Sequence, residues 1–459
     1  MQQSNDKVVL FEQTPIPKAV AQLAVPTVLS SLVMVLYNLA DTFWVGMLND
    51  PIQNAAVTLA APVLLAFNAV NNLFGVGSSS MMSRALGRKD FDTVSRSSAF
   101  GFYCAIICGI AFSVLCIIFE QPLLSLLGAD ASTLEATRSY MFWTVSCGAV
   151  PAILNVVMAY LVRSEGAAMH ASIGTMSGCL LNIVLDPIFI LPWGLNMGAG
   201  GAGLATFISN CVACLYFFVL LLIKRGKTYV CINPKQFSFR RDIVSGVCAV
   251  GVPASIQNLL NVTGMTILNN FSSAYGADAV AAIGICQKIY MVPMYVSQGI
   301  SQGVMPLVSY NYSSGNVARM KHAVSFARQA ALTVIISVAV LFFLFPGFWV
   351  SLFMKNEVII EYGTHLMRGF CLGLPFLSID FLAVGVFQAV GMGRESLLFA
   401  ILRKIVLEIP ALFILNSTVG LYGLAYAQFC AEVILATAAI LVLRRLFSRL
   451  EAADNLHRQ

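Results

Sequence analysis

Charged residues are scarce in this chain of 459 residues. Asp, Glu, Lys and Arg together make up 10% of the sequence, whereas 58% of it is hydrophobic. A soluble globular protein carries about 25% charged residues. The scarcity excludes an ordinary soluble domain and predicts a polytopic membrane protein. The net charge of +6 does not indicate nucleic-acid binding, because the information lies in where the charges fall.

Groups typical of catalysis or cross-linking are also few or poorly placed. The four histidines lie at or near the ends of apolar segments, with no H-E-x-x-H motif and no evident nucleophile–base pair. This disfavours a membrane-embedded enzyme, and we expect no cofactor. The twelve cysteines fall mostly in apolar segments, so we interpret them as small hydrophobic packing residues. The polar first 18 residues do not resemble a cleavable signal peptide.

Long apolar runs are what the sequence has in quantity. A membrane-spanning helix needs about 20 apolar residues. Twelve runs satisfy this requirement and predict an all-α membrane protein with twelve transmembrane helices. They are 19–47, 57–83, 97–119, 137–160, 171–191, 201–223, 244–275, 280–311, 323–348, 361–390, 397–416 and 421–443.

The loops between these runs alternate in charge. One set of loops holds 21 of the 27 Lys and Arg residues, and the opposite set holds only Arg138 and Lys355. Basic loops face the cytoplasm. We therefore predict that both termini and the segment 224–243 are cytoplasmic. We expect the membrane to be the plasma membrane, or the inner membrane if the source is a Gram-negative bacterium.

The two halves of the chain repeat one another. Val25-Pro26 matches Val252-Pro253 at an offset of 227 residues, and Asp186 matches Glu408 at an offset of 222. Six spans in each half give both halves the same orientation, which is a parallel repeat. We predict a six-helix bundle over 1–223, a basic linker over 224–243, a second bundle over 244–443 and a basic tail over 444–459. Two equivalent bundles suit alternating access.

Two acids stand out within the first bundle. Asp41 follows Tyr37 and Asn38 on one helical face, and Asp186 follows Asn182 by one turn. A carboxylate inside a membrane span is costly and is usually functional. Such a pair suits a hard cation such as Na⁺, or a proton held between like charges. The alternative is a permanently protonated acid that only joins helices.

Several motifs resemble those of the multidrug and toxic compound extrusion (MATE) family, in order and over essentially the whole chain. They are Pro26 with Tyr37–Gly46, the stretch Arg84–Asp90, Arg163-Ser164-Glu165-Gly166, Asn182–Pro187 and Gly200–Thr206. The resemblance implies a V-shaped twelve-helix antiporter that exchanges H⁺ or Na⁺ for organic cations. Within the prokaryotic branch it places a cation site in the N-terminal bundle, with Asp41, Asn182, Asp186 and Thr206 as coupling residues. Na⁺ would bind at Asp41, Asn182 and Asp186, and Pro26 would be a hinge.

The second half departs from the Na⁺-coupled branch of the same family. That branch carries a glutamate where this chain has Gln257 and Asn258, and Asp380 lies near its aspartate. These departures disfavour a cation site in this bundle. Lys404 precedes Glu408 by one turn, so we expect a salt bridge. Such paired charges either lock the bundle or take part in binding substrate or protons. Lys288 also needs a partner, for which Asp380 and Glu408 are the candidates.

Residues that line the central cleft are predicted from side-chain type. Aromatic, Met and amide side chains suit varied lipophilic cations, although ordinary helix packing explains them as well. The candidates are Tyr37, Asn38, Tyr140, Asn155, Gln257, Met291, Met294, Tyr295, Gln298, Gln302 and Asp380. We expect a monomer that handles small cationic lipophilic compounds, contacts membrane lipid and binds no nucleic acid. The main alternative is a flippase for a lipid-linked substrate, which favours a cleft ringed by several Arg or Lys.

Overall fold

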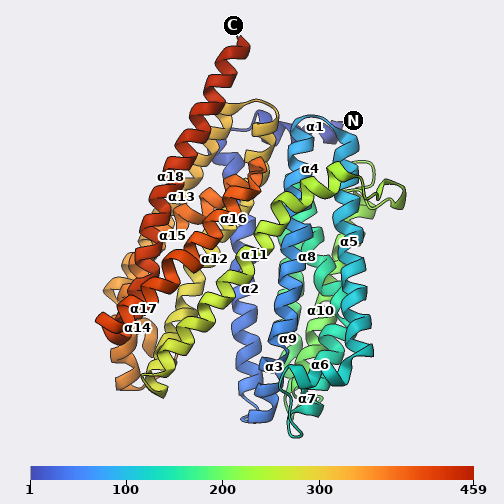
Figure 1. Ribbon diagram of the computed structural model, residues 1–459. Helices are drawn as coiled ribbons and strands as arrows, with labels where there is room; N and C mark the ends of the chain where they lie inside the picture. Colours follow the sequence, from blue (N-terminus) through green and yellow to red (C-terminus); the bar gives the residue numbers. More distant parts are fainter. Residues whose placement is uncertain (1, 459) are drawn as a thin grey trace. The chain divides into compact units, whose positions relative to one another are not determined.

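The computed structural model describes the backbone of residues 2–458 and the side chains of residues 7–453. The regular elements in this part of the chain are helices (Figure 1). The first half holds α1 (Gln2–Glu12), α2 (Ile16–Gly46), α3 (Pro51–Asn71), the π-helix η1 (Asn72–Val76), α4 (Gly77–Gly87), α5 (Phe91–Ile118), α6 (Glu120–Leu126), α7 (Leu134–Met141), the π-helix η2 (Phe142–Cys147), α8 (Ala149–Ser164), α9 (Ala168–Ile190) and α10 (Ala199–Ile223).

The second half begins after a linker that contains the short 3₁₀ helix η3 (Pro234–Gln236). It holds α11 (Arg241–Ser273), α12 (Ala277–Ser313), α13 (Val317–Leu344), α14 (Pro346–Ser351), α15 (Glu357–Val390), α16 (Gly393–Ile401), the π-helix η4 (Leu402–Glu408), α17 (Ile409–Thr418), the 3₁₀ helix η5 (Gly420–Tyr422) and α18 (Gly423–Arg458).

Most predicted spans coincide with helices long and apolar enough to cross a membrane. Among the described residues there are ten such helices, and a bent pair, Leu134–Cys147 with Ala149–Ser164, makes an eleventh with a bend of 51°. The predicted span 397–416 coincides with the continuous run α16–η4–α17. This run carries Arg403, Lys404 and Glu408, so it is less apolar than the others. Its charges are buried within protein, which is how a membrane helix accommodates them.

The helices form two compact units. Unit 1 contains residues 1–13 and 29–255, and unit 2 contains residues 14–28 and 256–459. The changes of unit therefore fall inside α2 and α11, two or three residues after Pro26 and Pro253. This division follows packing and leaves the linker inside unit 1. The division at 224–243 that the repeat predicts stays a prediction about the membrane bundles.

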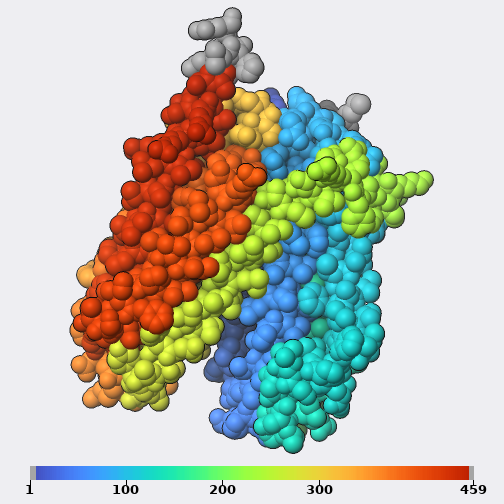
Figure 2. Space-filling model, in the orientation of Figure 1, coloured from blue at the N-terminus to red at the C-terminus, as the bar shows by residue number. Residues whose placement is uncertain are grey.

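Unit 1 has two distinguishable ends. The helix α1, the turn between α4 and α5 and the linker lie at one end, which we call the basic end, and α6 and α7 lie at the other (Figure 1). The linker projects at the basic end (Figure 2) and is bonded to α5, since the Tyr103 hydroxyl donates to the Ile232 carbonyl at 2.7 Å. Met81, Phe100 and Val247 form part of a buried cluster there. The start of α11 is thereby fixed to α4 and α5.

Close helix packing in unit 1 depends on glycine at a few contacts. A Cβ atom at Gly174 of α9 would lie 2.4 Å from the ring of Phe217 on α10. A Cβ atom at Gly203 of α10 would lie 2.9 Å from the Tyr140 carbonyl oxygen on α7. Small residues at such positions let membrane helices approach one another. Gly203 in particular brings the next turn of α10, with Thr206, toward α7 and α9.

Unit 2 is built around the long helices α12, α15 and α18. The Ser301 and Ser309 hydroxyls of α12 donate to the Phe381 and Ala389 carbonyls of α15, each at 2.8 Å. Phe387 of α15 lies in a fully buried cluster with Phe399 of α16 and Leu435 of α18. These contacts hold α15, α16 and α18 together within unit 2.

Candidate cation-binding site

The predicted coupling residues come together inside unit 1. Asp41 is on α2, Asn182 and Asp186 are on α9, and Thr206 is on α10. Asp186 has no solvent exposure and Asn182 is 2% exposed. Asp41 and Asp186 are close enough to interact electrostatically, and Tyr140 interacts with both acids. Helix α2 and the consecutive helices α9 and α10, which are distant from α2 in the sequence, therefore converge on two carboxyl groups.

Asn182 links α9 to α10 and to Asp186. With its amide oriented so that both ends find partners, the nitrogen donates to Asp186 Oδ2 at 3.0 Å. The amide oxygen then accepts the Thr206 backbone N–H, also at 3.0 Å. In the opposite orientation the nitrogen donates to the Thr206 hydroxyl at 3.3 Å. In both orientations Asn182 bonds Thr206 of α10, and in the first it also bonds the Asp186 carboxylate.

Each acid retains an oxygen that nothing in the described part of the chain satisfies. Asp41 Oδ1 and Asp186 Oδ1 are both buried and lack a hydrogen-bond partner. A buried polar atom without a partner is rare and needs an explanation. A proton or a cation shared by the two carboxyl groups would satisfy both oxygens and reduce the repulsion between two negative charges.

The donor set fits either ion. Two carboxylates, the Asn182 amide and the Thr206 hydroxyl are hard oxygen groups of the kind that Na⁺ prefers. Among the described residues no group of three or more His, Cys, Asp or Glu side chains is placed to hold a metal ion. The site therefore depends on neutral oxygens as well as on the two acids, and the same pair can hold a proton instead.

A second cluster of ionisable residues lies in unit 2. The Arg403 guanidinium of η4 reaches Glu432 of α18, with Nε 2.7 Å from Glu432 Oε1, and Asp380 of α15, with Nη2 3.3 Å from Asp380 Oδ2. All three side chains are at most 3% exposed. Arg403 also lies over the ring of Phe381 at 4.8 Å. This cluster holds three helices together through one cation.

Lys404 and Glu408 form a separate pair on the same π-helix. The Lys404 ammonium lies 2.6 Å and 2.8 Å from the two Glu408 carboxylate oxygens, and both side chains are largely buried. A Cβ atom at Gly264 of α11 would lie 2.9 Å from Lys404 Cδ. Glycine at position 264 therefore leaves space for the lysine side chain.

Comparison with known proteins fits this architecture. The MatE family model matches residues 26–188 and again residues 253–414. The chain belongs to the MatE family. A curated relative, the multidrug export protein MepA of Staphylococcus aureus (strain MRSA252), is 31% identical over 447 residues, which is 97% of each chain.

Solved MatE structures share the whole fold. A structure described as the outward-facing conformation of a multidrug resistance MATE family transporter superposes with a TM-score of 0.91, at 28% identity, over 97% of this chain and 98% of that one. Another, described as MATE in the bent conformation, gives a TM-score of 0.88, at 28% identity, over 98% and 99% of the two chains. The all-helical membrane fold predicted from the sequence is therefore confirmed. The two matches of the family model, which begin at Pro26 and Pro253, agree with the predicted internal repeat.

The other predicted residues of this MatE chain lie in different settings. Tyr37 is half-buried and interacts with Asp41, whereas Asn38 on the same helix is exposed. Asn155 is buried, and its amide donates to the Pro151 carbonyl at 2.7 Å and to Asn210 Oδ1 at 3.1 Å. In unit 2, Gln257 accepts a hydrogen bond from Gln388 at 3.3 Å, and Met291, Met294, Tyr295, Gln298 and Gln302 are half-buried.

Two features of unit 2 differ from what the sequence suggested. Lys288 was expected to pair with Asp380 or Glu408, but these acids bind Arg403 and Lys404, and Lys288 is exposed on α12. The connection of Arg403 to Glu432 was missed. A signal for it existed, because an ionisable Glu432 within the last apolar span needs a buried partner. The positions of the residues in the sequence did not indicate that Arg403 was the partner of Glu432.

Proposed function

We propose that this protein is a secondary-active multidrug efflux antiporter that exchanges H⁺ or Na⁺ for organic cations or related amphipathic compounds by alternating access. Support comes from the family membership and from relatives that are named as multidrug exporters. The observation that carries the proposal is the Asp41–Asp186 pair, with one unsatisfied buried oxygen on each acid. The substrates of a MepA-like exporter are small molecules, and we expect the protein to act as a monomer.

Coupling requires that the ion favours one conformation, since equal affinity for two conformations shifts neither. We infer that an ion entering from outside neutralises Asp41 and Asp186 and rearranges α2 about Pro26. The drug, held near the acids or between the bundles, is then released outward. The position of Pro26 supports a hinge, because α2 passes from one compact unit to the other two residues later. Proline removes a backbone donor and weakens the helix at that point.

The proposed orientation places the basic end of unit 1 in the cytoplasm, with both chain termini on that side. The asymmetric distribution of Lys and Arg supports this assignment. The protein then resides in the plasma membrane, or in the inner membrane of a Gram-negative source. A flippase for a lipid-linked substrate receives less support, because the buried Arg403 and Lys404 are already paired with acids of their own unit.

Transport by purified protein in liposomes tests this function. Asp41→Asn and Asp186→Asn should each abolish export driven by an imposed H⁺ or Na⁺ gradient. Asp278→Asn is a matched control, because Asp278 is an exposed acid in the first turn of α12. Imposing each gradient separately on the wild-type protein identifies the coupling ion. Gradient-driven export at the wild-type rate by either site variant would locate the coupling residues elsewhere.

A further inference from the structure

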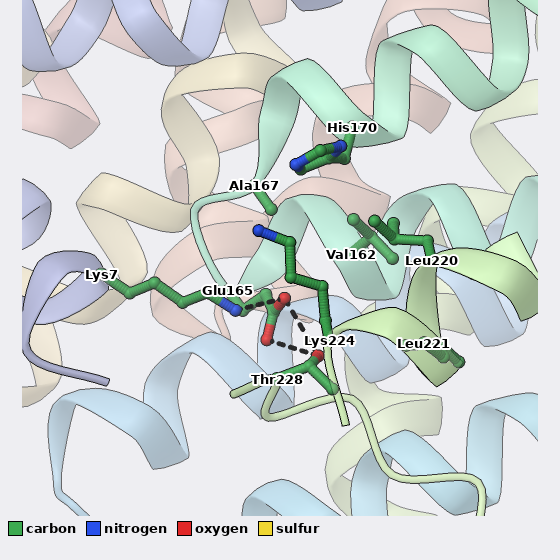
Figure 3. A pocket seen from close by; sticks show the side chains of 9 residues that line it. All are labelled: Lys7, Val162, Glu165, Ala167, His170, Leu220, Leu221, Lys224 and Thr228. Atoms are coloured by element: carbon green, nitrogen blue, oxygen red, sulfur yellow. Dashed lines mark hydrogen bonds and ion pairs between the residues drawn. The ribbon is translucent and has the colours of Figure 1, made fainter. Parts of the chain in front are cut away.

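A small pocket of about 40 Å³ is lined in part by residues of α1 and of the start of the linker (Figure 3). It therefore lies at the basic end of unit 1, and none of the Asp41 site residues line it. Its polar side chains are Lys7 of α1, Glu165 after α8, His170 of α9, and Lys224 and Thr228 after α10. The remaining walls are apolar. Three separate parts of the chain thus bring two lysines and a histidine to one cavity that contains a single acid.

Glu165 is already neutralised within the pocket. It accepts the Lys7 ammonium at 2.5 Å, the Thr228 hydroxyl at 3.0 Å and the Tyr229 backbone N–H at 2.6 Å. Its side chain is 4% exposed. With one ammonium and two further donors, this carboxylate has no need of a second cation.

Lys224 is the positive charge left over. Its side chain extends toward Ala167 and His170 rather than toward Glu165 (Figure 3). Within residues 7–453 it forms no ion pair and no side-chain hydrogen bond. His170 bonds the Tyr216 hydroxyl through Nδ1 at 3.1 Å, which leaves Nε2 as the nitrogen available to a ligand. The pocket therefore offers an unpaired ammonium beside an imidazole, a combination suited to an anion.

Exposed apolar side chains adjoin the pocket residues in the sequence of α9 and α10. α9 and α10 pack together here, and their exposed side chains beside the pocket are Met169 and Ile173 on α9 and Leu222 and Ile223 on α10. Leu222 and Ile223 are 70% and 73% exposed and immediately precede Lys224. Exposed apolar side chains next to a lysine at the end of a membrane helix match the boundary between acyl chains and headgroups.

We propose that this pocket binds the phosphate of an anionic phospholipid, with Lys224 as the main contact and His170 as a second. The acyl chains lie along the exposed apolar residues of α9 and α10. Free inorganic phosphate shares the charge chemistry but makes no use of the adjacent apolar surface, so we assign the site to a lipid. The assignment does not depend on the transport cycle, because it concerns binding alone.

Native mass spectrometry of the purified protein with phosphatidylglycerol or phosphatidylcholine tests the assignment. A lysine near a membrane surface contributes about 1 kcal/mol to binding an anionic lipid. Lys224→Gln should therefore weaken phosphatidylglycerol binding about fivefold and leave phosphatidylcholine binding unchanged. Lys224→Arg keeps the charge and should keep the affinity. Lys227→Gln is the matched control, because Lys227 is exposed in the same loop and does not line the pocket.

Three results would overturn the assignment. The first is phosphatidylglycerol binding by Lys224→Gln at the wild-type affinity. The second is an equal loss in Lys227→Gln, which would indicate a diffuse surface effect. The third is displacement of phosphatidylglycerol by millimolar inorganic phosphate, which would indicate a free-anion site. Because Lys224 is half-exposed and unpaired, Lys224→Gln should unfold at the wild-type temperature, and a thermal melt verifies this.

Discussion

Removing the Arg403 side chain should destabilise unit 2 more than removing any other arginine of that unit's membrane helices. In Arg403→Met, Asp380 and Glu432 lose the cation that they share, and each already has an oxygen without a hydrogen bond among the described residues. Removing one partner from a buried ion pair costs about 3–5 kcal/mol, because the other charge stays buried. We expect a loss in this range, with further loss of the packing against Phe381.

The assay measures unfolding of the purified protein in detergent, once by denaturant titration and once by thermal melting. Arg368→Met is the matched control, because Arg368 lies on the same helix as Asp380 but is exposed and contacts only Phe343 among its described interactions. It should change stability by less than about 1 kcal/mol. The triple variant Arg403→Met, Asp380→Asn, Glu432→Gln removes all three charges and should recover most of the loss. Unfolding of Arg403→Met at the wild-type midpoint would refute the reasoning, as would a triple variant less stable than the single one.

Two further predictions concern the second charge pair and the membrane orientation. Neutralising Lys404 or Glu408 alone should cost about 3–5 kcal/mol, whereas neutralising both should be milder because no buried charge is left unpaired. Unfolding midpoints measure this, and a double variant less stable than both single variants would contradict it. A cysteine introduced as Lys227→Cys, in the exposed linker, should react with an impermeant thiol reagent only from the cytoplasmic side. Reaction from outside in intact cells would reverse the proposed topology.

Hydropathy and charge were sufficient to predict the helical membrane fold, since each of the twelve predicted runs coincides with one helix or with consecutive helices, one pair of which is bent by 51°. They did not reveal that the chain passes from one compact unit to the other within α2 and within α11. The hydrophobic pattern of one helix does not tell which other helices it packs against. The sequence suggested the Asp41 site for a different reason. Asp186 and Asn182 are neighbours on one helical turn, and local spacing is visible in a sequence.

The Arg403 cluster could not be predicted from local spacing in the sequence. Asp380, Arg403 and Glu432 lie on three helices, and their pairing depends on how α15, η4 and α18 pack. Lys288 is a second residue whose surroundings could not be predicted from the sequence. Its charge within an apolar run required a partner or an aqueous surrounding, and spacing alone did not distinguish between them. The exposed position of Lys288 and the existing partners of Asp380 and Glu408 decide the question.

The internal repeat makes the two halves comparable position by position, and the comparison explains why coupling is assigned to the first half. At the offset of 222 residues, Lys404 and Glu408 correspond to Asn182 and Asp186. In unit 1 a neutral amide bonds the acid, whereas in unit 2 an ammonium does so at 2.6 Å.

The glycine that leaves room for the Lys404 side chain can also be compared with its equivalent residue in the first half. At the offset of 227 residues, Gly264 corresponds to Tyr37 and Leu268 corresponds to Asp41. Unit 2 thus lacks the second acid and has a glycine where the Lys404 side chain needs room. A covalently attached cation cannot be exchanged across the membrane. Asp186 has Asp41 beside it and is bonded by a neutral amide rather than by a cation of the protein. We therefore propose that Asp186 is the acid whose charge an external ion balances.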